Sequence, residues 1–295
     1  MSVPAIRNIV AGTSLDIASD RVVARAAELA RRCGARLHLA HGHALPMALY
    51  GAPAGLTTVA PDLLDAERQV RLELLSQQLE RIGIAPDLVA STQIASGAAH
   101  RVVLELAKSE QADLIVLGGS EGTFHLLGST ADRVLRKASC PIWVVQSAQL
   151  APSRVVAPLD LSELAGECLH RGLEVVECVF GGRQLPLEAL LVVTAGDYQE
   201  HPEMSSEAVE SAARSDLERY LSTVAPTAAP VLRKGDVRTE IVDYANQHGA
   251  MLVLGTHGRS GFERFLLGSV AADVAARSKH DVLIVPPAAA HAEPA

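Results

Sequence analysis

The sequence of 295 residues has few aromatic residues, only four cysteines and no long apolar run. Aromatic residues make up 3% of the chain although 48% of it is hydrophobic, so its cores must be built mainly from alanine, valine and leucine. The cysteines (Cys33, Cys140, Cys168 and Cys178) form no CxxC pair, and we interpret them as reduced packing residues. No stretch approaches the roughly 20 apolar residues of a membrane helix. The sequence therefore predicts neither disulfides nor a membrane span.

The chain also lacks an excess of positive charge and a signal-peptide pattern. Its formal net charge is −8, which argues against coating nucleic acid or an anionic membrane, because both repel a negative protein. Its start runs directly into an apparent strand at 9–12, without a charged and then apolar layout. We expect a cytoplasmic protein with neither nucleic acid nor membrane as a partner. A small phosphorylated ligand stays compatible, because a few local donors outweigh net charge.

Several catalytic and metal-binding patterns are missing as well. There is no GxxxxGK[S/T] loop and no GxSxG elbow, which argues against a P-loop enzyme and an α/β-hydrolase. His38, His41 and His43 cluster near one expected strand, and a zinc site with His100 is imaginable, but hydrogen-bonded or solvent-facing histidines are the simpler interpretation. We predict no catalytic residue and no metal ligand.

What the chain does contain is an internal repeat. Four segments recur in the same order in its two halves, which indicates a duplication with a seam at 147–153. The matched pairs are 8–12 with 154–158, 113–118 with 251–255, 126–129 with 266–269, and 141–145 with 281–285. We predict a first domain at 1–147, a second at 153–287, and a flexible tail at 288–295.

Each half alternates short apolar runs with segments of helical periodicity. In the first half, strands are expected at 9–12, 36–41, 88–94, 114–117 and 142–145. Uniformly apolar strands are typical of parallel sheets covered by helices on both faces. The predicted fold class is α/β, with two tandem, open, doubly wound, Rossmann-like parallel sheets. Such sheets bind ligands at the carboxyl ends of their strands, where the strand order reverses.

The second half has a glycine pattern at that expected edge. A strand ending at residue 254 runs into Gly255-Thr256-His257-Gly258, and nine residues later Gly268-Ser269 opens a helix. The first two glycines allow the backbone to approach a ligand, and the helix N-terminus favours an anion. Arg259 and Arg264 are candidates for polyphosphate charge. The alternative is that the glycines only cap a strand and a helix and bind nothing.

The spacing Gly255-x-x-Gly258-x9-Gly268-Ser269 resembles the nucleotide-binding signature of the universal stress protein family, of its ATP-binding kind. The resemblance covers nearly the whole chain, as a tandem member with an adenine-nucleotide alpha-hydrolase-like fold. It implies a stress-response regulator that binds ATP or another adenine nucleotide, with or without Mg²⁺, and hydrolyses it slowly at most. It also implies that the halves pack through their last strands as a pseudo-twofold internal dimer; a homodimer of two chains stays open.

The resemblance also assigns binding residues. The family has an aspartate after the first strand at the nucleoside end, a valine lining the adenine site and a glycine after the third strand, to which Asp160, Val193 and Gly235 correspond. The implied set is Pro158, Leu159, Asp160, Val193, Gly235, Gly255, Thr256, Gly258, Arg259, Gly268, Ser269 and Val270.

The first half departs from this pattern. Its segment 118–129 is three residues shorter before the Gly-Ser pair, lacks both arginines and contains Glu121. Ser14 stands where Asp160 does, although Asp16 is close enough to substitute after a small shift. We therefore predict that the first half does not bind ATP. The alternative function for the chain is a nucleotide-free interaction module of the same fold.

Overall fold

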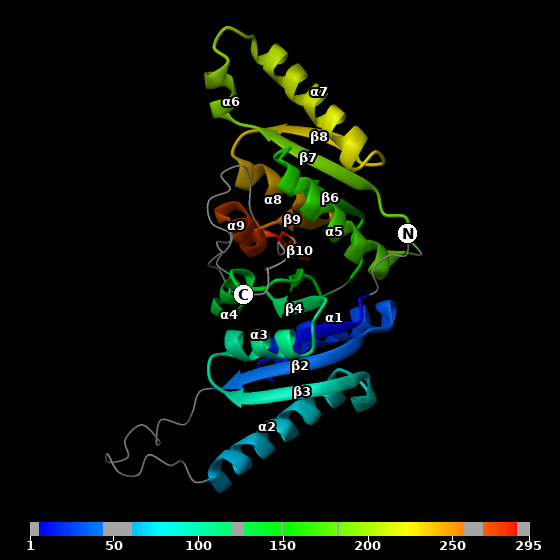
Figure 1. The fold of residues 1–295 in the computed structure, drawn as a ribbon, viewed down its shortest axis with the longest axis vertical. Coiled ribbons are helices and arrows are strands. Elements are labelled where there is room, and N and C mark those ends of the chain that lie inside the picture. The colour runs from blue at the N-terminus through cyan, green and yellow to red at the C-terminus, as the bar shows by residue number, and fades with distance from the viewer. Residues whose placement is uncertain are drawn as a thin grey trace, which may run out of the picture.

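The protein forms one continuous sheet that spans both halves of the chain. The structure, a computed structural model, describes residues 6–43, 61–119, 127–148, 150–181, 183–256 and 268–287. Its 10 strands run in the order β3-β2-β1-β4-β5-β10-β9-β6-β7-β8 (Figure 1). Read outward from the centre, each half repeats the same order, so the predicted duplication is visible as two equivalent five-strand units.

The first half contains the strands expected from its apolar runs. Its elements are β1 (Asn8–Gly12), α1 (Ile17–Cys33), β2 (Arg36–His43), α2 (Pro61–Arg81), β3 (Val89–Ser96), α3 (Ala99–Ser109), β4 (Leu114–Gly118), α4 (Ser129–Leu135) and β5 (Ile142–Val145). A single 3-10 turn, Pro86–Leu88, precedes β3.

The second half repeats this order with one additional short helix. Its elements are β6 (Arg154–Pro158), α5 (Glu163–Phe180), β7 (Leu187–Val193), α6 (Ala195–Glu200), α7 (Ser206–Val224), β8 (Ala229–Lys234), α8 (Val237–His248), β9 (Ala250–Gly255), α9 (Ser269–Arg277) and β10 (Val282–Val285).

Local sequence sets several helix boundaries. Asp16, Ser162 and Asp236 cap the starts of α1, α5 and α8, and each side chain accepts an N–H of the first turn. Gly34 and Gly249 end α1 and α8 in the left-handed conformation, with φ of 65° and 58°. The two glycine-terminated helices lead directly into the next strands, which begin at Arg36 and Ala250.

Helices cover both faces of the sheet, as the uniformly apolar strands predict (Figure 1). Helices α1, α2, α5 and α7 contribute to the aliphatic clusters on one face, and α3, α4, α8 and α9 to the cluster on the other. Both main clusters include residues of β5 and β10, so each core runs without a break from one half to the other. The fold is therefore an α/β/α sandwich.

The two sheets predicted from the sequence are joined by their last strands. β5 and β10 pair antiparallel with Trp143 opposite Leu283, whereas every other strand pair is parallel. Asp281 fixes this junction: its carboxylate accepts the Trp143 indole N–H at 2.7 Å and pairs with Arg25 of α1. The Arg25 and Asp281 side chains are 2% and 5% exposed, so this ion pair between the halves is buried.

The cysteines and the helices agree with the expectations from composition. The four cysteines are free thiols, and burial raises the pKa of Cys168 to about 11 and of Cys140 to about 12, so both stay protonated near neutral pH. Across the described parts of the chain, no helix is both long and apolar enough to cross a membrane.

Candidate functional site

A cavity of about 660 Å³ opens at the carboxyl ends of β6, β7 and β9. It lies at the point where strand order reverses in the second half, because β6 has β9 on one side and β7 on the other. Pairing between β6 and β9 extends only to Val156 and Leu252, so the two strand ends diverge beyond it. The divergence leaves room between Pro158 and Gly255, where parallel sheets of this kind bind ligands.

Asp160 lines the cavity from a constrained turn that follows β6. Leu161, which follows it, has a φ of 62°, and Ser162 then caps α5. Asp160 Oδ1 accepts the Ser162 amide at 3.1 Å and the Ser162 hydroxyl at 2.7 Å. These bonds orient the carboxylate, which suits it for accepting hydrogen bonds from a ligand's hydroxyl groups.

The start of α9 also lines the cavity, on the side of β9. Gly268 caps the helix in an extended conformation, and its amide donates to the Thr256 carbonyl at 2.7 Å. The Thr256 amide in turn donates to the Val285 carbonyl at 3.2 Å, which ties this loop to β10. Ser269 and Val270 therefore bring the first free N–H groups of α9 to the cavity, a favourable place for an anion.

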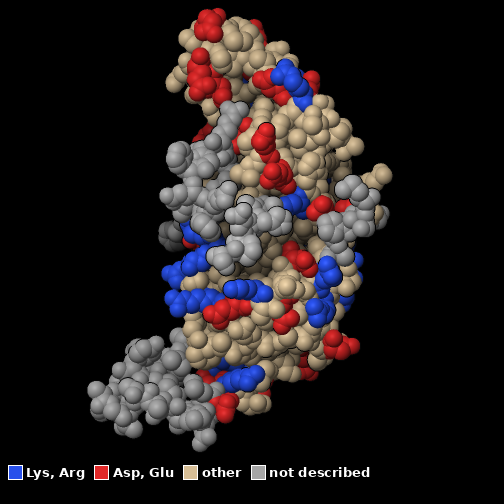
Figure 2. Space-filling model, in the orientation of Figure 1, with Lys and Arg blue, Asp and Glu red and all other residues tan. Residues whose placement is uncertain are grey.

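The outer wall of the cavity comes from α6 and α7, whose residues were not assigned to the site from the sequence. α6 begins at a capping box of Thr194 and Asp197. Asp197, Glu200 and Asp216 add carboxylates to the lining near Asp160. Figure 2 shows the acidic side chains gathered around α6 and α7. A T-x-x-D capping box in the sequence was the signal that could have revealed this helix.

The structure brings most of the predicted residues together. Those that line the cavity are Pro158, Leu159, Asp160, Val193, Gly255, Thr256, Gly268, Ser269 and Val270. Gly235 lies beside it rather than in it: its amide donates to the Val193 carbonyl at 3.0 Å, and its φ of 141° requires glycine. Gly258, Arg259 and Arg264 lie outside the described residues.

Comparison with known proteins decides the family. A model of the universal stress protein family matches the chain twice, at residues 5–146 and 152–286. The chain belongs to the universal stress protein family. Universal stress protein A homolog 2 of Coxiella burnetii is 34% identical over 147 residues, or 48% of this chain and 94% of that protein. A universal stress protein of Mycobacterium tuberculosis is 25% identical over 236 residues, or 75% of this chain and 77% of that protein.

Solved structures show the same fold along the whole chain. A Pseudomonas aeruginosa protein of unknown function has a TM-score of 0.67 at 19% identity, covering 97% of this chain and 94% of its own. A universal stress protein from Archaeoglobus fulgidus has a TM-score of 0.61 at 17% identity, covering 94% and 97%. This chain is thus a tandem universal stress protein in which two family domains share one sheet.

The first half of this universal stress protein uses the same turn with different side chains. Leu15 matches Leu161 in having a φ of 65°, but Ser14 takes the place of Asp160. Asp16 is at the helix-cap position, where it accepts the Ser19 amide at 3.1 Å and the Ser14 hydroxyl at 2.7 Å. The Ser14 hydrogen bond lowers the pKa of Asp16. Asp16 therefore caps α1 instead of substituting for the pocket carboxylate.

His38 and His41 of the first half are hydrogen-bonded side chains. His38 is buried with its Nδ1 2.7 Å from the Ser91 hydroxyl, and His41 Nδ1 donates to the Thr13 carbonyl at 2.9 Å. The rings of His41 and His43 stack at 6.0 Å, as expected for side chains on one face of a strand. Among the described residues, no group of three or more potential ligands is placed to hold a metal ion.

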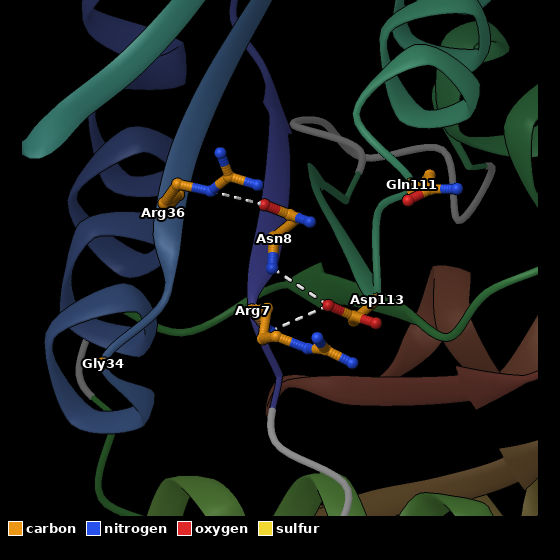
Figure 3. A pocket seen from close by; sticks show the side chains of 6 residues that line it. All are labelled: Arg7, Asn8, Gly34, Arg36, Gln111 and Asp113. Carbon is orange, nitrogen blue, oxygen red and sulfur yellow. Dashed lines mark hydrogen bonds between the residues drawn. The ribbon is translucent and has the colours of Figure 1, made fainter.

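A second cavity, of about 420 Å³, lies at the amino ends of β1, β2 and β4, the edge of the sheet opposite to the site (Figure 3). Asp113 accepts the amides of Arg7 and Asn8 at 2.8 and 2.9 Å, and Arg36 Nε donates to the Asn8 side chain at 3.0 Å. Figure 3 shows the Arg7 and Arg36 guanidinium groups pointing in different directions. The two cations do not converge on a common ligand position.

Proposed function

We propose that this universal stress protein binds one adenine nucleotide, ATP in particular, in the cavity of its second half and acts as a nucleotide-dependent regulator. The observation that supports this is the placement of Asp160 and the α9 N-terminus in the lining of one cavity. A carboxylate suits ribose hydroxyl donors, and helix N–H groups suit phosphates. The volume of about 660 Å³ is in the usual range for small-molecule sites.

The middle of the cavity is suited to an adenine ring. Leu159 and Val193 are buried beside it, and Val209, Ala212 and Ala213 of α7 contribute small apolar surfaces. Apolar walls with a few polar groups at the ends are typical of sites that hold a flat base and orient its polar substituents. These contacts support a nucleotide over a free inorganic anion.

The same lining supports regulation rather than rapid turnover. At the α9 end, the described lining consists of glycine, serine, threonine and aliphatic residues, without a carboxylate or histidine. Rapid hydrolysis requires a positioned group that activates water or orients it at the terminal phosphate. We therefore expect slow ATP hydrolysis at most.

Calorimetric titration with ATP and magnesium tests the proposal. We expect a stoichiometry of one nucleotide per chain for the wild type and loss of binding in a Gly268→Val, Ser269→Ala double variant. Gly268 has φ of −58° and ψ of 140°, a conformation that valine also adopts, so the variant should keep its fold. Circular dichroism and thermal unfolding verify that it does.

The repeat supplies a matched control. Gly128 and Ser129 occupy the equivalent positions in the first half, and Gly128 has nearly the same conformation, with φ of −54° and ψ of 143°. Gly128→Val, Ser129→Ala should leave ATP binding intact. Absence of ATP binding in the folded wild type would instead support a nucleotide-free interaction module, and two sites per chain would show that the first half also binds.

A further inference from the structure

A guanidinium group that the sequence did not single out lies at the start of α9, next to residues that line the cavity. Arg238, in the first turn of α8, donates from Nη2 to the Ser269 hydroxyl oxygen at 2.9 Å. Its neighbours Val237 and Ile241 line the cavity. The first turns of α8 and α9 thus meet beside the cavity and bring one positive side chain to the first residue of α9.

Arg238 differs from nearby arginines in the partner that it contacts. Arg233 and Arg277 form ion pairs with Glu240 and Asp273 at 2.9 and 3.0 Å. Within the described part of the chain, the hydrogen-bond partner of Arg238 is the neutral Ser269 hydroxyl, and it forms no ion pair. Its positive charge is therefore available to an anion placed at the start of α9.

The hydrogen bond also prepares Ser269 to donate. A serine hydroxyl has one donor and two acceptor positions. Because Ser269 Oγ accepts from Arg238, its own proton is directed to a different partner. A guanidinium has five N–H donors, so Arg238 keeps others for an anion. The pair presents a cation and a hydroxyl donor from two different helices.

The carboxylates of the lining disfavour phosphate beside them. Asp160, Asp197, Glu200 and Asp216 all line the cavity, the last three from α6 and α7, which follow β7 on the side of β6 away from β9. Four carboxylates repel a polyphosphate, so a bound nucleotide should place its phosphates at the α9 end, beside Arg238.

The first half lacks this cation. Gly97 and Gly235 are equivalent, because both have positive φ values, of 137° and 141°. His100 follows Gly97 at the same distance in sequence as Arg238 follows Gly235, so it takes the position of Arg238. His100 is buried, and burial together with the charges of Arg133 and Lys137 lowers its pKa. The first half therefore has a side chain that is neutral near pH 7 at the position where the second half has Arg238.

We propose that Arg238 binds the terminal phosphates of the nucleotide together with Ser269, and that it makes the second half select di- and triphosphates over AMP and adenosine. This inference rests on the proposed function. Charge-assisted bonds of guanidinium to phosphate are among the stronger polar contacts in proteins. Removing one should weaken ATP binding by about 10- to 100-fold.

The test compares wild type, Arg238→Gln, Arg238→Lys and the control Arg277→Gln by calorimetry with ATP, AMP, adenosine and inorganic tripolyphosphate. Arg277→Gln removes the same charge from the last turn of α9, away from its N-terminus. We expect Arg238→Gln to lose affinity for ATP and tripolyphosphate and to keep that for adenosine. Arg238→Lys should recover part of the loss, because lysine keeps the charge without the guanidinium fork.

The outcomes separate the two proposals. An equal loss for adenosine and ATP, or a loss in Arg277→Gln as large as in Arg238→Gln, would overturn the role of Arg238. Unchanged ATP affinity in a folded Arg238→Gln protein would overturn it as well and leave the proposed function standing. Tripolyphosphate binding that depends on Arg238, without binding of ATP or adenosine, would support the phosphate role and contradict the proposed function.

Discussion

The two halves of the protein share a backbone plan and differ in the side chains attached to it. Gln78 and Tyr220 show the likeness: each donates to the carbonyl of the residue that caps the first helix of its half, at 3.2 and 2.7 Å. The difference lies in the side chains at this same cap, where Ser14 and Asp16 exchange the residue types of Asp160 and Ser162. Duplication has therefore preserved the positions that hold the fold, whereas the positions that face a ligand have diverged.

The largest effect is expected where the halves are joined asymmetrically. The residue before β10 is Asp281, whereas Pro141 precedes β5. Asp281→Ala would leave the buried Arg25 with only the longer Glu28 contact, at 3.7 Å, and the Trp143 indole N–H without its acceptor. We expect the free energy of unfolding to fall by about 3–5 kcal/mol in urea denaturation.

A surface pair provides the control for that measurement. Asp273→Ala breaks the partly exposed ion pair with Arg277, and this should cost less than about 1 kcal/mol. Equal losses in the two variants would show that Asp281 does not hold the halves together more strongly than a surface ion pair.

A smaller effect is expected from making the second half resemble the first at its turn. The exchange Asp160→Ser, Ser162→Asp removes the carboxylate from the cavity and keeps a good helix cap, because both residue types cap helices. ATP affinity should fall about 10- to 100-fold, as expected for loss of a charged hydrogen-bond acceptor. Calorimetry measures the affinity, and thermal unfolding should be nearly unchanged.

The reciprocal exchange, Ser14→Asp with Asp16→Ser, sharpens the comparison. It gives the first half the pocket carboxylate but leaves His41 and His43 on the strand where the second half has Leu191 and Val193. We expect no second nucleotide site. Two sites per chain would show that this one turn accounts for the difference between the halves.

The smallest effect is expected from lowering the pH, which should reduce the free energy of unfolding mainly through histidines of the first half. Burial lowers the pKa of His38, His41 and His100 from the ordinary value near 6.5. The unfolded chain then binds more protons than the native one, so stability is full above about pH 6.5 and declines as the pH falls toward the native pKa values.

Urea denaturation at pH 8 and pH 5.5 measures this dependence. His41→Gln keeps a polar side chain and removes one titrating group, so the stability difference between the two pH values should shrink. His201→Gln, which changes an exposed histidine on the second half, is the control and should leave the difference unchanged. An equal effect of the two substitutions would contradict the assignment to buried histidines.

Much of this architecture could be predicted from the sequence because the two halves of the chain can be compared with each other. The repeat identified equivalent strands, and the glycine spacing pointed to the edge where the cavity lies. The Arg238–Ser269 contact could not be predicted, since it depends on how two helices distant in sequence pack together. Whether Asp16 substitutes for Asp160 also required coordinates, because it depends on the residue at which α1 begins. The family resemblance implied that the halves meet through their last strands, and the antiparallel β5–β10 pairing that merges the two sheets agrees with it.

The antiparallel β5–β10 pairing joins two halves of one chain, so dilution does not separate them. A connection as short as that between β5 and β6 keeps the two edges at an effective concentration on the order of millimolar, so their pairing is independent of how much protein is present. One half can then diverge at its ligand-facing positions and still cover the edge strand of the other half. Unlike a dimer of two separate chains, such a protein stays assembled when its concentration falls.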